Sequence, residues 1–165
     1  MFKRLRHFLY NLYSIQGEFS MARSASTYAS VIDGFKVETN KKYSPVGGTK
    51  CNIFAQDVMS AMSAPLPSGL ANQMADDLLN KKAPGWSLVT FQDAQNRANL
   101  GYPTIGIKKA DGHGHVVVVR PKGSSITILK EVQIAQAGTK NYNSNTINYS
   151  WVAADLPGVK FYTHD

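Results

Sequence analysis

The sequence predicts an α+β fold in which helices come first and an antiparallel sheet follows. Residues 52–64 are the clearest helical stretch, because apolar residues recur there every three or four positions. After Tyr102 the period changes to that of strands, and the run HVVVVRP at 115–121 is rich in β-branched residues. Helices and strands that are segregated along the chain are typical of α+β proteins.

Four helical segments are expected in the first two thirds of the chain: 28–38, 52–64, 68–80 and 91–101. Gly34 and Gly101 mark the ends of the first and the fourth. Thr49 is the expected N-cap of the second, which Pro65 ends. The small, polar residues 20–30 are expected to form a hinge, and the tripeptide PGW before the fourth helix predicts a turn.

Five strand segments are expected after the helices: 103–109, 115–121, 126–138, 141–154 and 159–165. The sequences DGHG and PKGSS separate the first three of them and predict turns. The third is long enough for one or two strands. Short connections between successive strands predict an antiparallel meander.

The chain is expected to form one domain over residues 21–165, preceded by a basic amphipathic segment at 1–20. The stretch FLYNLYSI is interrupted by Asn11 and Ser14, unlike the continuous apolar core of a secretory signal. Three interpretations stay open for this segment. It is a helix that packs on the domain or a partner, a leader or extension with Met21 as an alternative start, or a helix that contacts a membrane surface.

The composition is that of a globular protein, with 43% hydrophobic and 18% charged residues and a net charge of +7. The positive charge favours an anionic partner such as nucleic acid, an anionic membrane or a bacterial wall polymer. No basic stripe with interleaved aromatic residues is visible, so we do not expect nucleic-acid binding. No apolar run reaches the roughly 20 residues that a membrane span requires.

Cys51 is the single cysteine, so it has no internal disulfide partner. It follows a glycine pair and lies at the expected start of a helix. Unpaired N–H groups and the helix dipole there favour a thiolate, and the same N–H groups can hold an oxyanion. The position favours a nucleophile with a lowered pKa, and a small hydrophobic filler stays open as the alternative.

A thiol nucleophile needs a base, and His115 is the best candidate because it belongs to a strand that holds its backbone rigidly. His113 lies in the glycine-rich turn before it. A histidine base usually has an orienting partner. The next strand offers Gln133 and Gln136, which we expect on one face. One alternative is a polar turn in which the two histidines are incidental. Another is a zinc site made by Asp111, His113 and His115, although no further ligand cluster stands out.

Four segments occur in one order along residues 28–165 and resemble one family: TKCNIFAQDVMSAM, AQNRANLGYP, GHVVVVRP and IAQAG. They are similar to the papain-like cell-wall hydrolases of the NlpC/P60 and CHAP superfamily. The resemblance implies a papain-like fold, with N-terminal helices packed on an antiparallel sheet. It also implies a cysteine amidase or endopeptidase that cuts an amide bond of peptidoglycan without a metal or other cofactor.

Within this resemblance, Cys51 matches the nucleophile, His115 the base and Gln136 the polar third residue. Gln136 departs from the Glu, Asn or His that is frequent in the family. Tyr43 is a candidate for holding the oxyanion, and four further residues are candidates for lining the cleft: Asn52, Trp86, Asn99 and Tyr102. The structural alternative for each is packing in the core or a loop.

The resemblance implies peptidoglycan as the main partner, with anionic wall polymers and, for a toxin, an immunity protein as further ones. It places the protein at the bacterial wall or in the periplasm, as a lysin, a toxin or a housekeeping hydrolase. The alternative function is a non-catalytic wall-binding module on the same fold.

Overall fold

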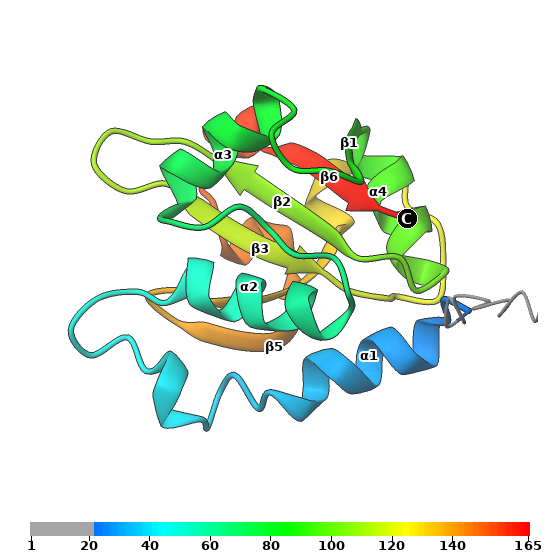
Figure 1. Ribbon diagram of the computed structural model, residues 1–165, viewed down its shortest axis with the longest axis horizontal. Helices are drawn as coiled ribbons and strands as arrows, with labels where there is room; N and C mark the ends of the chain where they lie inside the picture. The colour runs from blue at the N-terminus through cyan, green and yellow to red at the C-terminus, as the bar shows by residue number, and fades with distance from the viewer. Residues whose placement is uncertain (1–21) are drawn as a thin grey trace, which may run out of the picture.

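The computed structural model describes residues 22–165, which form an α+β domain with four α-helices and a six-stranded antiparallel sheet (Figure 1). The helices are α1 (Ala25–Gly34), α2 (Cys51–Ala61), α3 (Ala71–Leu79) and α4 (Phe91–Asn99). The strands are β1 (Trp86–Val89), β2 (Thr104–Lys108), β3 (His115–Val119), β4 (Gln133–Ala137), β5 (Asn141–Thr146) and β6 (Lys160–His164). The predicted α+β class, with helices and an antiparallel sheet, is therefore confirmed.

The helices lie where they were expected, but their bounds differ from the expected ones by up to four residues. The predicted hinge over 20–30 is wrong from residue 25 onward, because α1 begins there and Ser24 Oγ caps it by accepting from the N–H of Thr27. The N-cap of α2 is Lys50, which makes no side-chain cap, and not the predicted Thr49. Thr90 caps α4 by accepting from the N–H of Asp93.

The sheet has the order β1-β6-β2-β3-β4-β5 with every neighbouring pair antiparallel. The expected meander is confirmed for β2 through β5. The last strand, β6, does not extend the meander but returns to pair with β2. The edge strand β1 was not predicted, because its side chains are half-exposed and only its pairing with β6 gives it strand structure. Of the predicted segment 126–138, only residues 133–137 form a strand.

The core lies between the sheet and the helices, and α2 packs on β3 and β4. Figure 1 shows α2 and α3 on the near side of the sheet. Val116 to Val119 are all buried, as expected for a central strand. Tyr28 ties α1 to the sheet, since its buried hydroxyl donates to Val119 O at 2.8 Å and accepts from Thr104 N at 3.2 Å.

The ladder of paired residues between β3 and β4 is short, and this leaves the beginning of β3 unpaired with β4. Its two Cα-partner pairs are Val118 with Ala135 and Val119 with Ile134. The beginning of β3, at His115, therefore has no pairing with β4. A register shift in the pairing of β4 with β5 lies just before Gln136. The separated ends of the two strands leave room for side chains to meet.

No helix among residues 22–165 is long and apolar enough to cross a membrane. The interpretations of the segment 1–20 lie outside the described residues.

Candidate active site

Cys51 is the first residue of α2, and several polar groups around its sulfur oppose a rise of its pKa. They are the backbone N–H groups of Cys51, Asn52 and Val116 and the hydroxyl of Thr49. Two of these N–H groups belong to the first turn of the helix, where intrahelical acceptors are missing. The third comes from the residue that follows His115 on β3. The fold therefore brings the thiol of α2 to the beginning of the histidine strand.

Burial determines the protonation of this thiol. Cys51 is only 5% exposed, and this desolvation raises its pKa above the ordinary thiol value, although the surrounding donors oppose the shift. The expectation that a helix N-terminus lowers the pKa of Cys51 is therefore wrong for the molecule without substrate. Desolvation of the charged sulfur outweighs the effect of these polar groups, so the resting group is a neutral thiol.

His115 and Gln136 are joined directly, with His115 Nε2 and Gln136 Oε1 2.8 Å apart. The amide nitrogen of Gln136 donates to the carbonyl oxygen of Lys140 at 2.8 Å. A carbonyl oxygen only accepts, which fixes the orientation of the amide and leaves Oε1 as the acceptor toward the histidine. His115 therefore carries its proton on Nε2, and Nδ1 keeps a free lone pair that can accept a proton.

The surroundings of His115 favour this neutral form. Burial lowers the pKa of His115 below its ordinary value, and the hydrogen bond with Gln136 only partly offsets this effect. The ring of Trp151 meets the imidazole edge to face, with the ring centroids 5.1 Å apart. A neutral imidazole is the form of histidine that acts as a general base.

Gly138 leaves the space that the pair His115–Gln136 needs. A Cβ atom at this position would lie 2.9 Å from Gln136 Nε2 and 3.4 Å from His115 Cε1. Any larger residue would push the amide away from the imidazole. The requirement at Gly138 is therefore steric, and this glycine belongs to the sequence IAQAG.

Two neighbouring hollows contain these groups. One, of about 460 Å³, is lined by His115, Gln136 and Trp151, among others, and the second, of about 430 Å³, by Cys51 and Asn52, among others. The residues that line both of them are Thr49, His113 and Gly114. The thiol and the imidazole make no direct hydrogen bond, and catalytic hydrogen bonds are often long before substrate binds.

Asn72 at the beginning of α3 fixes the loop that carries His113, a role the sequence did not reveal. Its amide nitrogen donates to Ala110 O at 2.9 Å, and its amide oxygen accepts from Ala110 N at 3.2 Å. A Cβ atom on Gly114 would lie 2.3 Å from that oxygen. The glycine-rich turn was visible in the sequence. Its contact with Asn72 was not, because Asn72 is distant from the turn along the chain.

The structure does not bring Tyr43 or Trp86 to the site. The ring of Tyr43 is buried, and its hydroxyl donates to Asp57 Oδ2 at 2.6 Å, so it is not available to an oxyanion. The indole nitrogen of Trp86 donates to Pro65 O at 3.0 Å, and its ring packs edge to face on His164. Both side chains stabilise the fold, which is the structural alternative considered for them.

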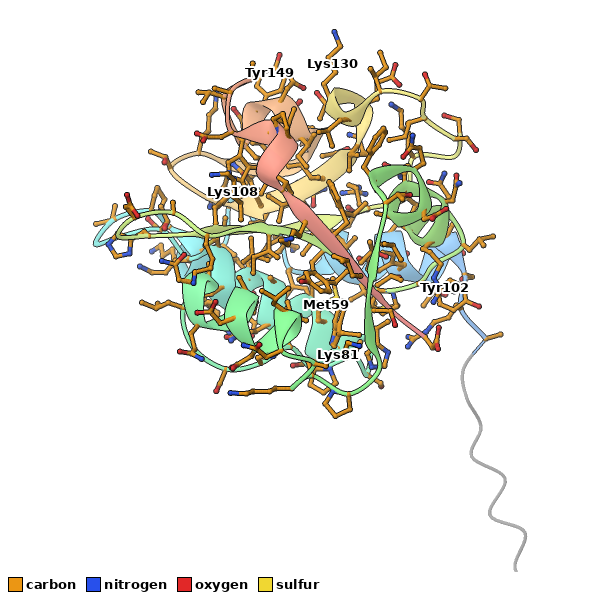
Figure 2. The ribbon with its side chains drawn as sticks, turned by 90° about the horizontal axis from the view of Figure 1, so that it is seen from above. Met59, Lys81, Tyr102, Lys108, Lys130 and Tyr149 are labelled. Atoms are coloured by element: carbon orange, nitrogen blue, oxygen red, sulfur yellow. The ribbon has the colours of Figure 1, made fainter. Side chains whose placement is uncertain are left out.

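Asn99 and Tyr102 also have structural contacts. The side chain of Asn99 holds the turn after β3, since it accepts from Lys122 N at 2.8 Å and donates to Ser124 O at 2.8 Å. The ring of Tyr102 stacks on the guanidinium of Arg97, whose Cζ lies 3.5 Å from the ring centroid. Figure 2 shows Tyr102 well separated from Lys108, one of the residues that line the His115 hollow. Of the five proposed substrate-binding residues, only Asn52 lies beside Cys51.

The two candidate glutamines have different partners. Gln133 donates to Ser144 Oγ at 2.8 Å, whereas Gln136 meets His115. The expectation that they share a face is wrong, because they are three positions apart in a strand and alternate sides. The structure thus gives the orienting position to Gln136.

The zinc alternative has no support in the part of the chain that the structure describes. No three His, Cys, Asp or Glu side chains between residues 22 and 165 come close enough together to hold a metal ion. Asp111 and His113 are exposed in the turn, whereas His115 is engaged with Gln136.

The sequence matches no protein-family model, and a comparison with curated proteins found no match.

Proposed function

We propose that this protein is a cysteine amidohydrolase that cleaves an amide bond of bacterial peptidoglycan, on a papain-like fold. The observation that carries the proposal is the hydrogen bond between His115 and Gln136, which orients a neutral imidazole at the strand end where the Cys51 thiol lies. Nucleophile, base and orienting residue are the three parts of a cysteine-hydrolase site. Peptidoglycan as the substrate rests on the sequence resemblance and suits the net charge of +7.

The reaction begins with transfer of the thiol proton from Cys51 to Nδ1 of His115, as the sulfur attacks the substrate carbonyl carbon. The carbon–nitrogen bond then breaks, and the imidazolium gives its proton to the leaving amine. Water attacks the resulting thioester and gives a proton to His115, which returns it to the sulfur as the acid is released. The N–H groups at the start of α2 are suited to hold the oxyanion.

Purified sacculi incubated with wild type, Cys51→Ser and Cys51→Ala test this proposal. We expect new amino groups and soluble fragments with wild type only. The folded state of each variant is checked by circular dichroism. Equal release by wild type and Cys51→Ala would overturn the assignment of the nucleophile, and no release by any of them would overturn the hydrolase.

A non-catalytic wall-binding module is the second candidate. The raised pKa of Cys51 and the absence of a direct hydrogen bond between the thiol and His115 favour it. This alternative predicts that wild type and Cys51→Ala co-sediment equally with sacculi and that neither releases amines.

A further inference from the structure

We infer that the hollow beside His115 receives the leaving-amine side of the substrate and selects a residue that carries a carboxylate. This inference rests on the proposed function and specifies the substrate class of the same site. Its key residue is Lys140, the position whose backbone carbonyl also holds Gln136.

The direction of the substrate follows from the chemistry of acyl transfer. The carbonyl carbon must bond to Cys51 Sγ, and the amide nitrogen must take a proton from His115. The acyl part therefore extends from the hollow that contains Cys51, and the leaving amine extends into the hollow that contains His115. The shared wall at Thr49 and Gly114 lies where the two hollows meet.

The two hollows differ in charge. Lysine and aspartate residues line only the one at His115: Lys108, Lys140 and Asp155. Lys108 and Asp155 form an ion pair, with Nζ and Oδ1 3.3 Å apart, and so balance each other. Lys140 makes no ion pair with any described residue, and its ammonium lies over the ring of Tyr142, 5.5 Å from the centroid. Lys140 therefore supplies a positive charge beside the hollow that no described carboxylate balances.

The hollow at Cys51 offers small and uncharged walls. Apart from Cys51 and His113, its lining consists of glycine, alanine, threonine, asparagine and leucine residues. It suits a small neutral group on the acyl side. A carboxylate is favoured only on the amine side, where Lys140 can approach it.

The aromatic residues give the amine-side hollow its shape. Trp151 packs against His115 and covers the imidazole from one side, and the exposed Tyr149 extends the same wall. Figure 2 shows Lys108 and Tyr149 on the part of the molecule away from Tyr102. The substrate residue that follows the cleaved bond would lie between this aromatic wall and Lys140.

The experiment compares native sacculi with sacculi whose free carboxyl groups have been amidated by carbodiimide and methylamine. Lys140→Glu is paired with Lys130→Glu, which makes the same charge change at an exposed residue that lines neither hollow. Chemical labelling and mass spectrometry of the new amino termini identify the leaving residue.

We expect wild type to cleave amidated sacculi about five-fold more slowly, since Lys140 is exposed and an ion pair at an exposed lysine contributes only modestly. Lys140→Glu should lower kcat/KM on native sacculi about ten-fold, mainly through KM, and respond less to amidation. Lys130→Glu should resemble wild type in both respects. The labelled amino terminus should belong to a residue with a free carboxylate.

The two proposals fail in different ways. If no Cys51-dependent cleavage occurs on either substrate, the hydrolase proposal is overturned. If cleavage occurs but Lys140→Glu behaves as Lys130→Glu does, or the new amino terminus belongs to a residue without a carboxylate, the carboxylate subsite is overturned and the hydrolase stands.

Discussion

His115 Nε2 lies 2.8 Å from the amide oxygen of Gln136, and the amide nitrogen of Gln136 is held by the carbonyl oxygen of Lys140. These two linked hydrogen bonds fix both the tautomer and the orientation of the imidazole. A neutral amide does this without adding a negative charge next to the histidine. The pKa of His115 therefore remains lowered by burial. A carboxylate partner would instead raise this pKa, because its negative charge would stabilise the imidazolium.

The first prediction concerns Gln136. Replacing it by alanine removes the acceptor from His115 Nε2, so the proton is free to move to Nδ1 and the ring can rotate. We expect kcat for amine release from sacculi to fall about 10- to 100-fold, with little change in KM. Gln133→Ala is the matched control, because that side chain contacts Ser144 on the neighbouring strand. A comparable loss in both variants would contradict the orienting role of Gln136.

The second prediction concerns Gly138. The methyl group of Gly138→Ala would approach Gln136 Nε2 to 2.9 Å, so the amide must move. The backbone of Gly138 does not have the positive φ that favours glycine, and alanine should therefore cause little strain there. We expect a melting temperature close to that of wild type and a marked loss of kcat. Gly34→Ala, at the end of α1 with open space around it and no positive φ, is the steric control. Full activity of Gly138→Ala would show that the amide position is not critical.

The third prediction is the pH dependence of Cys51 alkylation. The pKa of Cys51 is raised by burial, so the reactive thiolate is scarce until the pH exceeds the ordinary thiol value of about 8.5. Iodoacetamide should react slowly at pH 7 and faster only in alkaline solution. The same protein in denaturant, where burial is lost, should react at lower pH. Rapid alkylation of the folded protein at pH 6–7, on the order of that of a thiolate–imidazolium pair, would contradict a neutral resting state.

The fourth prediction is the acid limit of activity. Burial lowers the pKa of His115, so the base stays neutral below its ordinary pKa of about 6.5. We expect kcat/KM to decline only at a pH below that value. A folded-state pKa below the unfolded one also means that the stability from this group is present above about pH 6.5 and is lost as the pH falls. Kinetics between about pH 4 and 8 measure the limit. A midpoint above 6.5 would indicate that His115 pairs with a negative charge.

The fifth prediction separates Tyr43 from catalysis. Its hydroxyl donates to Asp57, which also pairs with Lys42 at 2.6 Å. Tyr43→Phe should lower the free energy of unfolding by about 1 kcal/mol, while kcat stays near that of wild type. Denaturant unfolding and sacculus digestion measure the two effects. A large loss of kcat with unchanged stability would return Tyr43 to the oxyanion role.

The sequence predicted the parts of this molecule that depend on local pattern. Apolar spacing predicted α2 and α3, and β-branched runs predicted β2 and β3. These elements were accessible because each has a period that a short window of residues reveals. The strand β1 has no such pattern, and its existence depends on hydrogen bonds to β6, about 75 positions later.

For the candidate site, too, the sequence indicated individual residues but not the contacts between them. The sequence alone pointed to Cys51 at a helix start and to His115 on a strand, because both signals lie within a few residues. It did not show that Gln136 rather than Gln133 meets His115, nor that Trp151 and Lys140 lie beside them. Those contacts depend on how β3 and β4 separate. Tertiary packing also reversed the expected pKa shift of Cys51, since burial results from the whole fold and outweighs the donors at the helix start.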